Sequence, residues 1–276
     1  MKDFSTRVAA ITGAGSGIGR ALAVELAASG CNLALSDIDA DGLAGTAELV
    51  ADRKLAVTTD VVDVADRTAM QAWADDTAEA HGAVHLVVNN AGVALAGTVE
   101  DTPMEDYDWI LGINLWGVIH GTKMFMPHLR AAEEGHIVNI SSVFGLFAQP
   151  SQSAYNATKF AVRGFTEALR QELDMDGGNV SCTCVHPGGI DTNIARNARL
   201  DKSLADVMPG DQEDVREGFQ KALHVSPEVA ARRILKGVRR NARRVLIGPE
   251  AYAVDALQRV LPTAYQRLVP LSTKLL

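Results

Sequence analysis

The 276-residue chain is poor in cysteine and in aromatic residues, and it contains no long hydrophobic run. Its three cysteines, Cys31, Cys182 and Cys184, are too few for a disulfide framework and favour a reduced cell interior. We interpret them as buried thiols, because Cys182 and Cys184 have no partner ligands nearby in the sequence for a metal. The apolar stretch at residues 8–11 is too short for a signal peptide, and no run of 18 apolar residues could span a membrane. These absences predict a cytoplasmic protein with no integral membrane segment and no metal site.

Positive charge is also in deficit. The chain has 26 Lys and Arg against 34 Asp and Glu, a formal net charge of −8. Nucleic-acid binding relies on basic residues that neutralise phosphates, so this balance argues against a nucleic-acid partner. Hydrophobic residues make up 47% and charged residues 22%, which is ordinary globular composition. No linker-like stretch or fixed-period repeat divides the chain, which indicates one domain.

Short apolar runs alternate with longer segments of helical periodicity. The expected strands are residues 7–12, 32–36, 55–59, 84–88, 135–140, 179–185 and 244–247, and the expected helices are residues 19–29, 40–52, 66–80, 104–129 and 153–174. Such alternation implies right-handed crossovers between parallel strands. We therefore predict an α/β fold, a doubly wound, mostly parallel seven-stranded sheet with helices on both faces. Ligands of such sheets bind beyond the carboxyl ends of the strands.

A glycine-rich loop, Thr12-Gly-Ala-Gly-Ser-Gly-Ile-Gly19, joins the first expected strand to the first helix. Glycine lets the backbone turn tightly and approach a ligand, and the start of a helix offers free N–H groups to a pyrophosphate. A flexible turn is the alternative, but the strand before the loop and the helix after it favour the phosphate site. No Gly-Lys-Ser/Thr sequence follows, which excludes a P-loop.

Asp37 ends the second expected strand. A carboxylate at this point can accept hydrogen bonds from the ribose hydroxyls of adenosine and repel a 2′-phosphate. Helix capping is the alternative, although Asp39 and Asp41 could cap equally well. No basic residue stands at Ser16 or Ile38 to receive a 2′-phosphate, so NAD is favoured over NADP.

Tyr155 and Lys159 lie about one turn apart at the start of the helix after the fifth strand, and therefore on one helix face. An ammonium group beside a phenol stabilises the phenolate and lowers the pKa of the phenol. Ser142 follows the fifth strand at the same sheet edge and can donate a hydrogen bond to a substrate oxygen. A Tyr–Lys pair at this spacing is common on protein surfaces, so it gains meaning only together with the glycine loop.

Several motifs, taken in this order along the chain, resemble those of the short-chain dehydrogenase/reductase family. They are Thr12-Gly-x-x-x-Gly-Ile-Gly19, Asn89-Asn-Ala-Gly92, Asn114, Ser142, Tyr155-x-x-x-Lys159 and Pro187-Gly188. The resemblance covers residues 5–195. It implies a single Rossmann-type domain over residues 1–276, a nicotinamide cofactor, and hydride transfer between an alcohol and a ketone.

The resemblance also implies catalytic roles. Tyr155 would be the general base in oxidation and the general acid in reduction, and Lys159 would lower its pKa and hold the nicotinamide ribose. Ser142, in preference to its neighbour Ser141, would polarise the substrate carbonyl. Asn114 would anchor a water that leads protons to the lysine. The alternative for Asn114 is a polar residue that distorts a helix while it satisfies the backbone.

Further cofactor contacts follow from the same resemblance. Asn90 and the two residues after it would pass beside the adenine ribose, although Asn90 could equally brace the central strands. Asp60 and Val61 would contact adenine, with a simple cap as the alternative for Asp60, and the segment from Pro187 would flank the nicotinamide amide. The expected cofactor-binding residues are Gly13, Ser16, Gly17, Ile18, Gly19, Asp37, Asp60, Val61, Asn90, Ala91, Gly92, Tyr155, Lys159, Pro187, Gly188, Ile190 and Thr192.

The strand–helix rhythm fades after this point. We interpret residues 193–225 as a substrate lid, with a solvated pair of surface helices as the alternative. Residues 229–249 are rich in arginine and contain no acidic residue, which favours a solvated helix face. The alternative is a binding surface for an anionic carrier, such as a thioester of CoA or of acyl carrier protein. Residues 250–276 form a C-terminal extension whose apolar stripe indicates packing or a subunit contact, with a membrane-surface anchor as the alternative.

Together these features predict an oxidoreductase that transfers a hydride between NAD(H) and a secondary alcohol or ketone. The apolar residues Val143, Phe144, Leu146, Phe147 and Ala148 favour a lipophilic small-molecule substrate, although they could equally belong to the core. One alternative is a 3-oxoacyl thioester reductase that uses NADPH. Another, of a different class, is a non-catalytic dinucleotide-sensing scaffold protein. The family resemblance implies a homo-oligomer, either a tetramer or a dimer.

Overall fold

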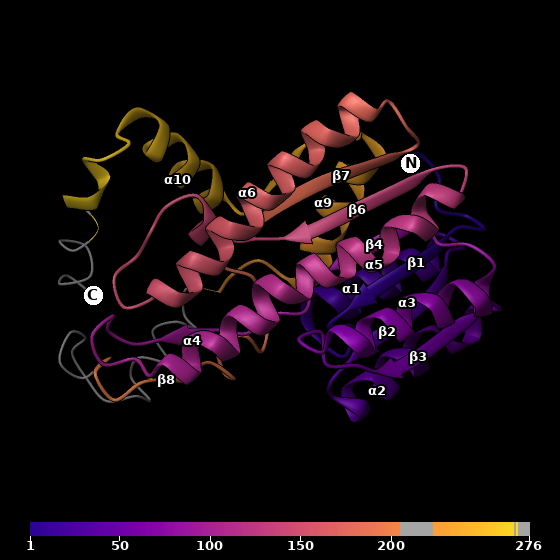
Figure 1. Cartoon of the computed structure of the whole chain (residues 1–276), viewed down its shortest axis with the longest axis horizontal. Helices are drawn as coiled ribbons and strands as arrows, with labels where there is room; N and C mark the ends of the chain where they lie inside the picture. Colours follow the sequence, from indigo (N-terminus) through magenta and orange to yellow (C-terminus); the bar gives the residue numbers. More distant parts are fainter. Residues whose placement is uncertain (205–222, 268, 270–276) are drawn as a thin grey trace.

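A central parallel sheet organises the molecule (Figure 1). The computed structural model describes residues 1–204, 223–267 and 269. Within them, seven parallel strands lie in the order β3-β2-β1-β4-β6-β7-β9. The strands are β1 (Val8–Thr12), β2 (Asn32–Asp37), β3 (Val57–Val61), β4 (Leu86–Asn89), β6 (Gly135–Ile140), β7 (Val180–Pro187) and β9 (Arg244–Ile247). This confirms the predicted fold class, and the strand order reverses between β1 and β4.

Helices cover both faces of this sheet. One face carries α1 (Gly17–Ala28), α2 (Ala40–Val50) and α9 (Pro227–Arg239), and the other carries α3 (Arg67–His81), α5 (Gly117–Ala131) and α6 (Ser153–Asp176). In Figure 1, α5 and α6 lie in front of the sheet and α9 lies behind it. Beyond the carboxyl ends of the strands lie α4 (Met104–Leu111), α10 (Pro249–Val260) and a small ribbon of β5 (Leu95–Ala96) and β8 (Arg199–Leu200).

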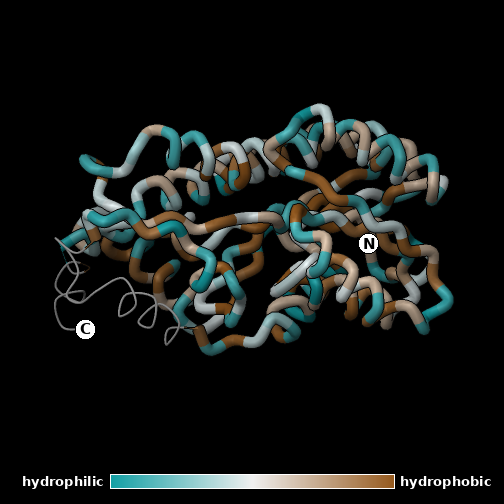
Figure 2. Tube along the Cα trace, turned by 90° about the horizontal axis from the view of Figure 1, so that it is seen from below, coloured by the Kyte–Doolittle hydropathy of each residue, from teal (hydrophilic) through white to brown (hydrophobic). Residues whose placement is uncertain are grey.

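The strands are buried on both faces, and their side chains alternate between two cores. Leu86 and Val88 of β4 pack into the core on the α1 side, whereas Val87 between them packs into the core on the α5 side. All three side chains are fully buried. Burying such a side chain contributes about 1.5–3 kcal/mol to stability, so these two cores supply much of the driving force for folding. In Figure 2 the hydrophobic segments accordingly lie in the interior, between helices with hydrophilic outer turns.

The sequence missed two local features. The helix expected over residues 104–129 is divided by a π-helical turn, η2 (Gly112–Trp116), which holds Asn114. Hydrophobic periodicity does not reveal one extra residue in a turn, and such turns often mark functional sites. The β5–β8 ribbon was also missed, because strands of two residues are too short to show alternation.

The third strand begins two residues later than expected, at Val57 instead of Leu55. Short 3₁₀ turns, η1 (Ala51–Arg53) and η3 (Val143–Gly145), follow α2 and β6 respectively. The shift in β3 moves its carboxyl end further along the chain. It therefore changes which residues lie at the ligand-binding edge of the sheet.

Two further expectations can be compared with the described residues. The cysteines Cys31, Cys182 and Cys184 are free and buried, which confirms their interpretation as core thiols. Burial raises the pKa of each thiol to about 12, so none is a ready nucleophile at neutral pH. In the described part of the chain, every helix is either too short or too polar to cross a membrane.

Two buried histidines should make the fold sensitive to acid. His136 of β6 is bonded to the Thr183 hydroxyl and His186 of β7 to the Ser142 carbonyl, and burial lowers their pKa values to about 3 and about 4. Both rings stay neutral in the folded chain but take up a proton near pH 6.5 when it unfolds. We therefore expect the free energy of unfolding to fall below pH 6.5, by about 1.4 kcal/mol per pH unit for each histidine.

Denaturant titrations between pH 7 and pH 4.5 measure this slope. His136→Gln keeps a hydrogen-bonding side chain that does not titrate, so the variant should lose stability less steeply with acid than the unaltered chain does. An identical slope in the two proteins would show that His136 is not responsible.

Candidate active site

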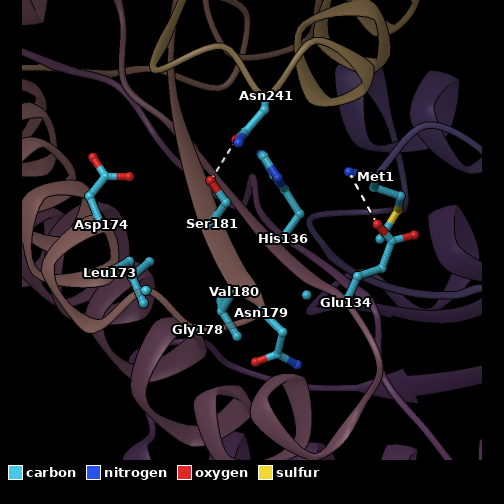
Figure 3. Close-up of a pocket in the computed structure, with 12 residues that line it drawn as sticks. Met1, Glu134, His136, Leu173, Asp174, Gly178, Asn179, Val180, Ser181 and Asn241 are labelled. Carbon is cyan, nitrogen blue, oxygen red and sulfur yellow. Dashed lines mark hydrogen bonds and ion pairs between the residues drawn. The ribbon is translucent and has the colours of Figure 1, made fainter.

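The described residues form two notable hollows. The larger, of about 600 Å³, lies at the carboxyl ends of the strands, where the strand order reverses. The smaller, of about 290 Å³, lies at the opposite ends of β6 and β7 (Figure 3). Parallel α/β sheets bind their ligands beyond the carboxyl ends of the strands, at the point where the strand order reverses. The larger hollow is therefore the candidate active site, and we call it the cleft.

The polar groups of the smaller hollow are occupied with one another. The amino group of Met1 lies 3.3 Å from a carboxylate oxygen of Glu134, and the hydroxyl of Ser181 donates to the side-chain oxygen of Asn241 at 2.6 Å (Figure 3). His136 in the same wall is bonded to Thr183. These groups stabilise the amino-terminal end of the sheet and present no arrangement for catalysis.

The glycine loop forms one wall of the cleft. Gly13, Ser16, Gly17 and Ile18 line it, and Gly13 and Gly17 have the positive φ values of 65° and 51°. Gly19 lies beneath this wall, where a Cβ atom would overlap with the carbonyl oxygen of Gly13. Ser16 precedes α1 without capping it through its side chain. The first N–H groups of α1 can therefore bind an anion in the cleft, as the sequence predicted for a pyrophosphate.

Asp37 lies at the end of β2, at the edge of the cleft. Its carboxylate accepts hydrogen bonds from the backbone N–H groups of Gly15 at 2.7 Å and Asp39 at 3.0 Å. The cap of α2 is Asp39, which accepts a bond from Gly42, so Asp37 does not serve as the cap. The guanidinium of nearby Arg20 is bonded to backbone carbonyls and to a threonine, so it is already engaged.

Asp60 and Val61, which the sequence assigned to adenine, are not among the residues that line the cleft. Asp60 lies near Asp76 of α3; burial raises the pKa of its carboxyl, and the negative charge of Asp76 raises it further. Val61 is 64% exposed. Asp63 and Val64 line the cleft instead. The sequence holds two Asp-Val pairs three residues apart, and the late start of β3 brings the second one to the sheet edge.

Asn90 joins the loops that follow β1 and β4. Its side-chain amide donates to the carbonyl oxygens of Thr12 and Gly13, both at 3.0 Å. The hydroxyl of Thr12 in turn accepts bonds from the backbone N–H groups of Asn90 and Ala91. The asparagine thus has the bracing role that the sequence left open. Asn90, Ala91 and Gly92 also line the cleft, so both interpretations agree with its position.

Asn114 is fully buried in the π-helical turn and does not line the cleft. Its side chain accepts a bond from the N–H of Val93 at 2.8 Å and donates to the carbonyl of Val93 at 2.9 Å. Gly92 lies between Asn114 and Lys159: a Cβ atom added to Gly92 would be 3.3 Å from the side-chain oxygen of Asn114 and 3.5 Å from the ammonium of Lys159. Asn114 therefore satisfies the backbone, as its alternative interpretation required, and it also lies close to the predicted catalytic lysine.

The predicted catalytic residues meet at the centre of the cleft. Ser142 follows β6, and Tyr155 and Lys159 lie in the first turns of α6, with all three side chains buried and lining the cleft. The Lys159 ammonium lies 5.5 Å from the centre of the Tyr155 ring and donates to the carbonyl of Ile140 at 3.2 Å. The hydroxyl of Ser141 is engaged with the carbonyl of Lys159 at 2.8 Å. This leaves Ser142 as the serine that can act on a ligand.

Burial dominates the acid–base properties of this group. It raises the pKa of Tyr155 to about 12, against a smaller lowering by the hydrogen bond with Ser142. It also lowers the pKa of Lys159 to about 8. The expected lowering of the phenol pKa by the ammonium is not among the influences on Tyr155, and loss of solvation sets the direction of the shift. At neutral pH, Tyr155 is a protonated phenol and can donate a hydrogen bond or a proton to an oxygen atom in the cleft.

The loop after β7 forms the next wall. Pro187, Gly188, Ile190 and Thr192 all line the cleft, as the sequence predicted. Sequence reasoning missed Glu250 at the start of α10, which also lines it. Its carboxylate accepts a bond from the Gly189 N–H at 2.6 Å and lies 3.2 Å from the imidazole of His224. No local pattern marks Glu250, because it reaches this loop only through the folding of the C-terminal extension.

Apolar side chains from several segments line the other half of the cleft. They are Leu95, Phe144, Phe147, Ile194 and Val254. The ring of Phe144 lies edge-on to Tyr155, with 5.9 Å between the ring centres. Tyr265 of the C-terminal extension accepts a bond from the N–H of Ala148 at 3.2 Å, and its ring contacts Phe147. Gln152, which the sequence analysis did not single out, also lines this half.

The predicted lid is only partly described, since residues 205–222 lie outside the described part of the chain. Its first residues are fixed: β8 pairs with β5, and Arg199 lies over the ring of Trp109 at 3.6 Å while it forms an ion pair with Asp106 at 2.8 Å. Asn193, Ile194, Asn197 and Ala198 line the cleft.

The arginines of residues 229–249 are largely engaged. Arg232 pairs with Glu25 of α1 at 2.9 Å, and Arg244 pairs with Asp255 of α10 through both terminal nitrogens. Arg239 lies over the ring of Phe4 at 4.7 Å. This basic stretch holds α9 and β9 against their neighbours, which agrees with a packed and solvated helix face.

Known proteins share this arrangement. Residues 7–203 match the family model for short chain dehydrogenases. SadH of Mycobacterium tuberculosis, a protein named as an oxidoreductase, is 52% identical over 271 residues, which cover 98% of this chain and 96% of that protein. The 2-(R)-hydroxypropyl-CoM dehydrogenase of Xanthobacter autotrophicus is 38% identical over 204 residues, 71% of this chain and 79% of that protein.

A solved structure agrees with these sequence matches. The crystal structure of a short chain dehydrogenase/reductase from Burkholderia phymatum in complex with NAD is 34% identical, with a TM-score of 0.85 and coverage of 94% of this chain and 95% of that one. The sheet order, the glycine loop, and the serine, tyrosine and lysine side chains that meet in the cleft fit the same family. The chain therefore belongs to the short-chain dehydrogenase/reductase family of oxidoreductases, with a Rossmann-type fold.

Proposed function

We propose that the protein is an NAD-dependent dehydrogenase or reductase that interconverts a lipophilic secondary alcohol and its ketone. The observation that carries this proposal is the buried group of Ser142, Tyr155 and Lys159, which lies between a phosphate-binding wall and an apolar wall of one cleft. The name of the Xanthobacter relative describes a 2-hydroxypropyl substrate, which is a secondary alcohol. The Burkholderia relative was crystallised with NAD.

The residues of the cleft fit a nicotinamide dinucleotide. The glycine loop leaves space where side chains would fill it, and the start of α1 provides N–H groups for a pyrophosphate. Asp37 would bind the adenosine ribose, Asp63 and Val64 would lie at the adenine, and Pro187 with the residues after it would flank the nicotinamide. When bound, the nicotinamide supplies or accepts the hydride.

The chain itself would manage the proton. Ser142 and Tyr155 would hold the substrate oxygen through their hydroxyl groups. In reduction, the Tyr155 hydroxyl gives its proton to the carbonyl oxygen as the carbonyl carbon gains the hydride, and in oxidation the two transfers reverse. The Lys159 ammonium, which persists at neutral pH because its pKa is about 8, would stabilise the phenolate that remains.

Removal of the Tyr155 hydroxyl tests this assignment. We expect Tyr155→Phe to lower kcat at least about 100-fold, since a positioned acid or base contributes that much, while NADH binding is retained. The formation or consumption of NADH with a panel of lipophilic alcohols and ketones measures kcat. Nucleotide fluorescence measures NADH binding. Tyr107→Phe is a matched control, because its hydroxyl is bonded to Ser153 nearby and takes no part in the proposed chemistry. Near-normal turnover by Tyr155→Phe would refute the assignment.

The NAD preference depends on Asp37. Its negative charge would repel a 2′-phosphate, so we expect the chain to bind NADH about 10-fold or more tightly than NADPH in fluorescence titrations. Asp37→Asn keeps an acceptor for the Gly15 N–H but removes the charge, and should narrow this preference by strengthening NADPH binding. Asp41→Asn is the control, since Asp41 lies in the first turn of α2 but is not among the residues that line the cleft, and it should leave the preference unchanged. Tighter binding of NADPH by the unaltered chain would overturn the assignment.

We further propose that residues 1–276 form one domain in which the C-terminal extension completes the substrate wall. Val254 lines the cleft, and Tyr265 is 5% exposed and fixes the segment that carries Phe147. These contacts support a packing role for the extension.

Opening this wall should weaken substrate binding. We expect Tyr265→Ala to raise KM for a lipophilic ketone about 10-fold, because the segment after Ser142 loses its support, while NADH affinity changes little. Tyr252→Ala is a suitable control, since Tyr252 lies in the same extension but is 53% exposed. An equal KM in Tyr265→Ala and the unaltered chain would show that the extension does not shape the substrate site.

The thioester reductase receives less support than it did from the sequence alone. Its main argument was the basic stretch, whose Arg232 and Arg244 are engaged in ion pairs. A scaffold protein would have no use for a buried lysine beside a buried tyrosine. We also propose a homo-oligomer in the cytoplasm. The homo-oligomer is supported by large apolar side chains that are exposed on neighbouring helical segments, namely Met104, Trp116 and Phe160. The cytoplasm is supported by the three free thiols, which agree with a reducing compartment.

A further inference from the structure

Gln152 is a buried polar side chain for which the chemistry described above has no use. It lines the cleft at the start of α6 and is only 8% exposed. It occupies the N-cap position of α6, yet its side chain does not cap the helix. No hydrogen bond joins its amide to any residue in the described part of the chain. A primary amide, with two donors and an acceptor, is thus left without a protein partner.

The backbone of Gln152 is held firmly, so the residue stays at the wall of the cleft. Its carbonyl accepts the N–H of Asn156 at 2.8 Å, and the carbonyl of the preceding Ser151 accepts the N–H of Gly97 at 2.8 Å. Gly97 and Gln152 form a parallel bridge. These bonds join the start of α6 to the end of β5, and the side chain of Gln152 lines the cleft at this junction.

The surroundings of this amide are apolar. Leu95 and Ala96 of β5 and the ring of Phe144 line the same half of the cleft. The amide atoms of Gln152 are not among the fully buried polar atoms without a partner, so water can bond to them in the cleft of the free protein. A ligand that displaces this water has to replace its hydrogen bonds or lose affinity. A ligand that bonds to the amide would replace them, and one that only fills the space would not.

The position of Gln152 relates it directly to the reacting group. It precedes Tyr155 by three residues, directly before the first turn of α6, and both residues line the cleft. Ser142 and Tyr155 are assigned to the reacting oxygen, so the amide lies within reach of an atom one or two carbons away from the reacting carbon. A neutral amide can bond to a hydroxyl as well as to a carbonyl oxygen, and it offers no charge to pair with an ionic group.

We propose that Gln152 determines substrate specificity by binding a second, uncharged oxygen of the substrate. The preferred substrate is then a lipophilic ketone or secondary alcohol that carries a hydroxyl or carbonyl oxygen on the first or second carbon from the reacting carbon. This inference rests on the proposed function, since it assigns the reacting oxygen to Ser142 and Tyr155.

A pair of ketones of equal size tests the proposal. 3-Hydroxy-1-phenylpropan-1-one and 1-phenylbutan-1-one differ only in a hydroxyl in place of a methyl group. We expect the unaltered chain to reduce the hydroxyketone with a kcat/KM about 10-fold higher or more. Gln152→Met replaces the amide by an apolar side chain of similar length. It should abolish this preference, with the loss of kcat/KM falling mainly on the hydroxyketone.

Gln171→Met is the matched control. Gln171 lies on the same helix, is exposed, and bonds only to the backbone carbonyl of Glu167. This variant should keep the full preference for the hydroxyketone. Retention of NADH binding by Gln152→Met shows that the variant is folded, and Gln152→Leu serves as a second apolar replacement if it does not bind.

The outcomes separate the two proposals. If the unaltered chain reduces both ketones equally, or if Gln152→Met keeps the preference, the role of Gln152 is refuted while the proposed function stands. If the unaltered chain binds NADH but turns over neither ketone nor the corresponding alcohols, the proposed lipophilic substrate is refuted, and the role of Gln152 is refuted with it.

Discussion

The cleft depends on the hydrogen bonds that join the loops after β1 and β4, where the strand order of the sheet reverses. At this point the chain leaves neighbouring strands toward opposite sides of the sheet, which opens a crevice. The Thr12 hydroxyl and the Asn90 amide tie the two departing loops to each other through four bonds. The glycine loop keeps its shape because Asn90 holds the carbonyls of Thr12 and Gly13. The wall of the cleft that the glycine loop forms is therefore held in place by the ends of these two strands.

The central group of the cleft combines stability with strained electrostatics. Lys159 and Tyr155 are buried at the start of α6, where loss of solvation disfavours the charged form of each. The fold accepts this cost because α6 is long and its far end packs into the core through Leu173. At neutral pH Tyr155 keeps its proton, and Lys159 is an ammonium whose pKa of about 8 lies close to that pH. Both groups can therefore take part in proton transfer near neutral pH.

The two halves of the cleft are built differently. The half assigned to the dinucleotide is formed by loops that directly follow the strands, so its geometry follows from the sheet. The half assigned to the substrate is formed by distant segments, including β5, the residues before β8, and the C-terminal extension. Glu250 links these regions, because its carboxylate binds the Gly189 N–H beside the proposed nicotinamide site. The C-terminal extension therefore contacts both halves, through Val254 in the apolar wall and through Glu250 at the loop after β7.

The sequence by itself determined the sheet, the glycine loop, Asp37 and the group of Ser142, Tyr155 and Lys159. Each depends on local spacing, because apolar runs specify buried strands and a one-turn separation specifies a shared helix face. Tertiary structure decided the rest. The register of β3 brought Asp63 to the cleft and not Asp60. A π-helical turn placed Asn114 against Val93. Contacts between distant segments brought Glu250 and Gln152 to the cleft. Such placements arise from packing between segments far apart in the chain, and local periodicity carries no record of them.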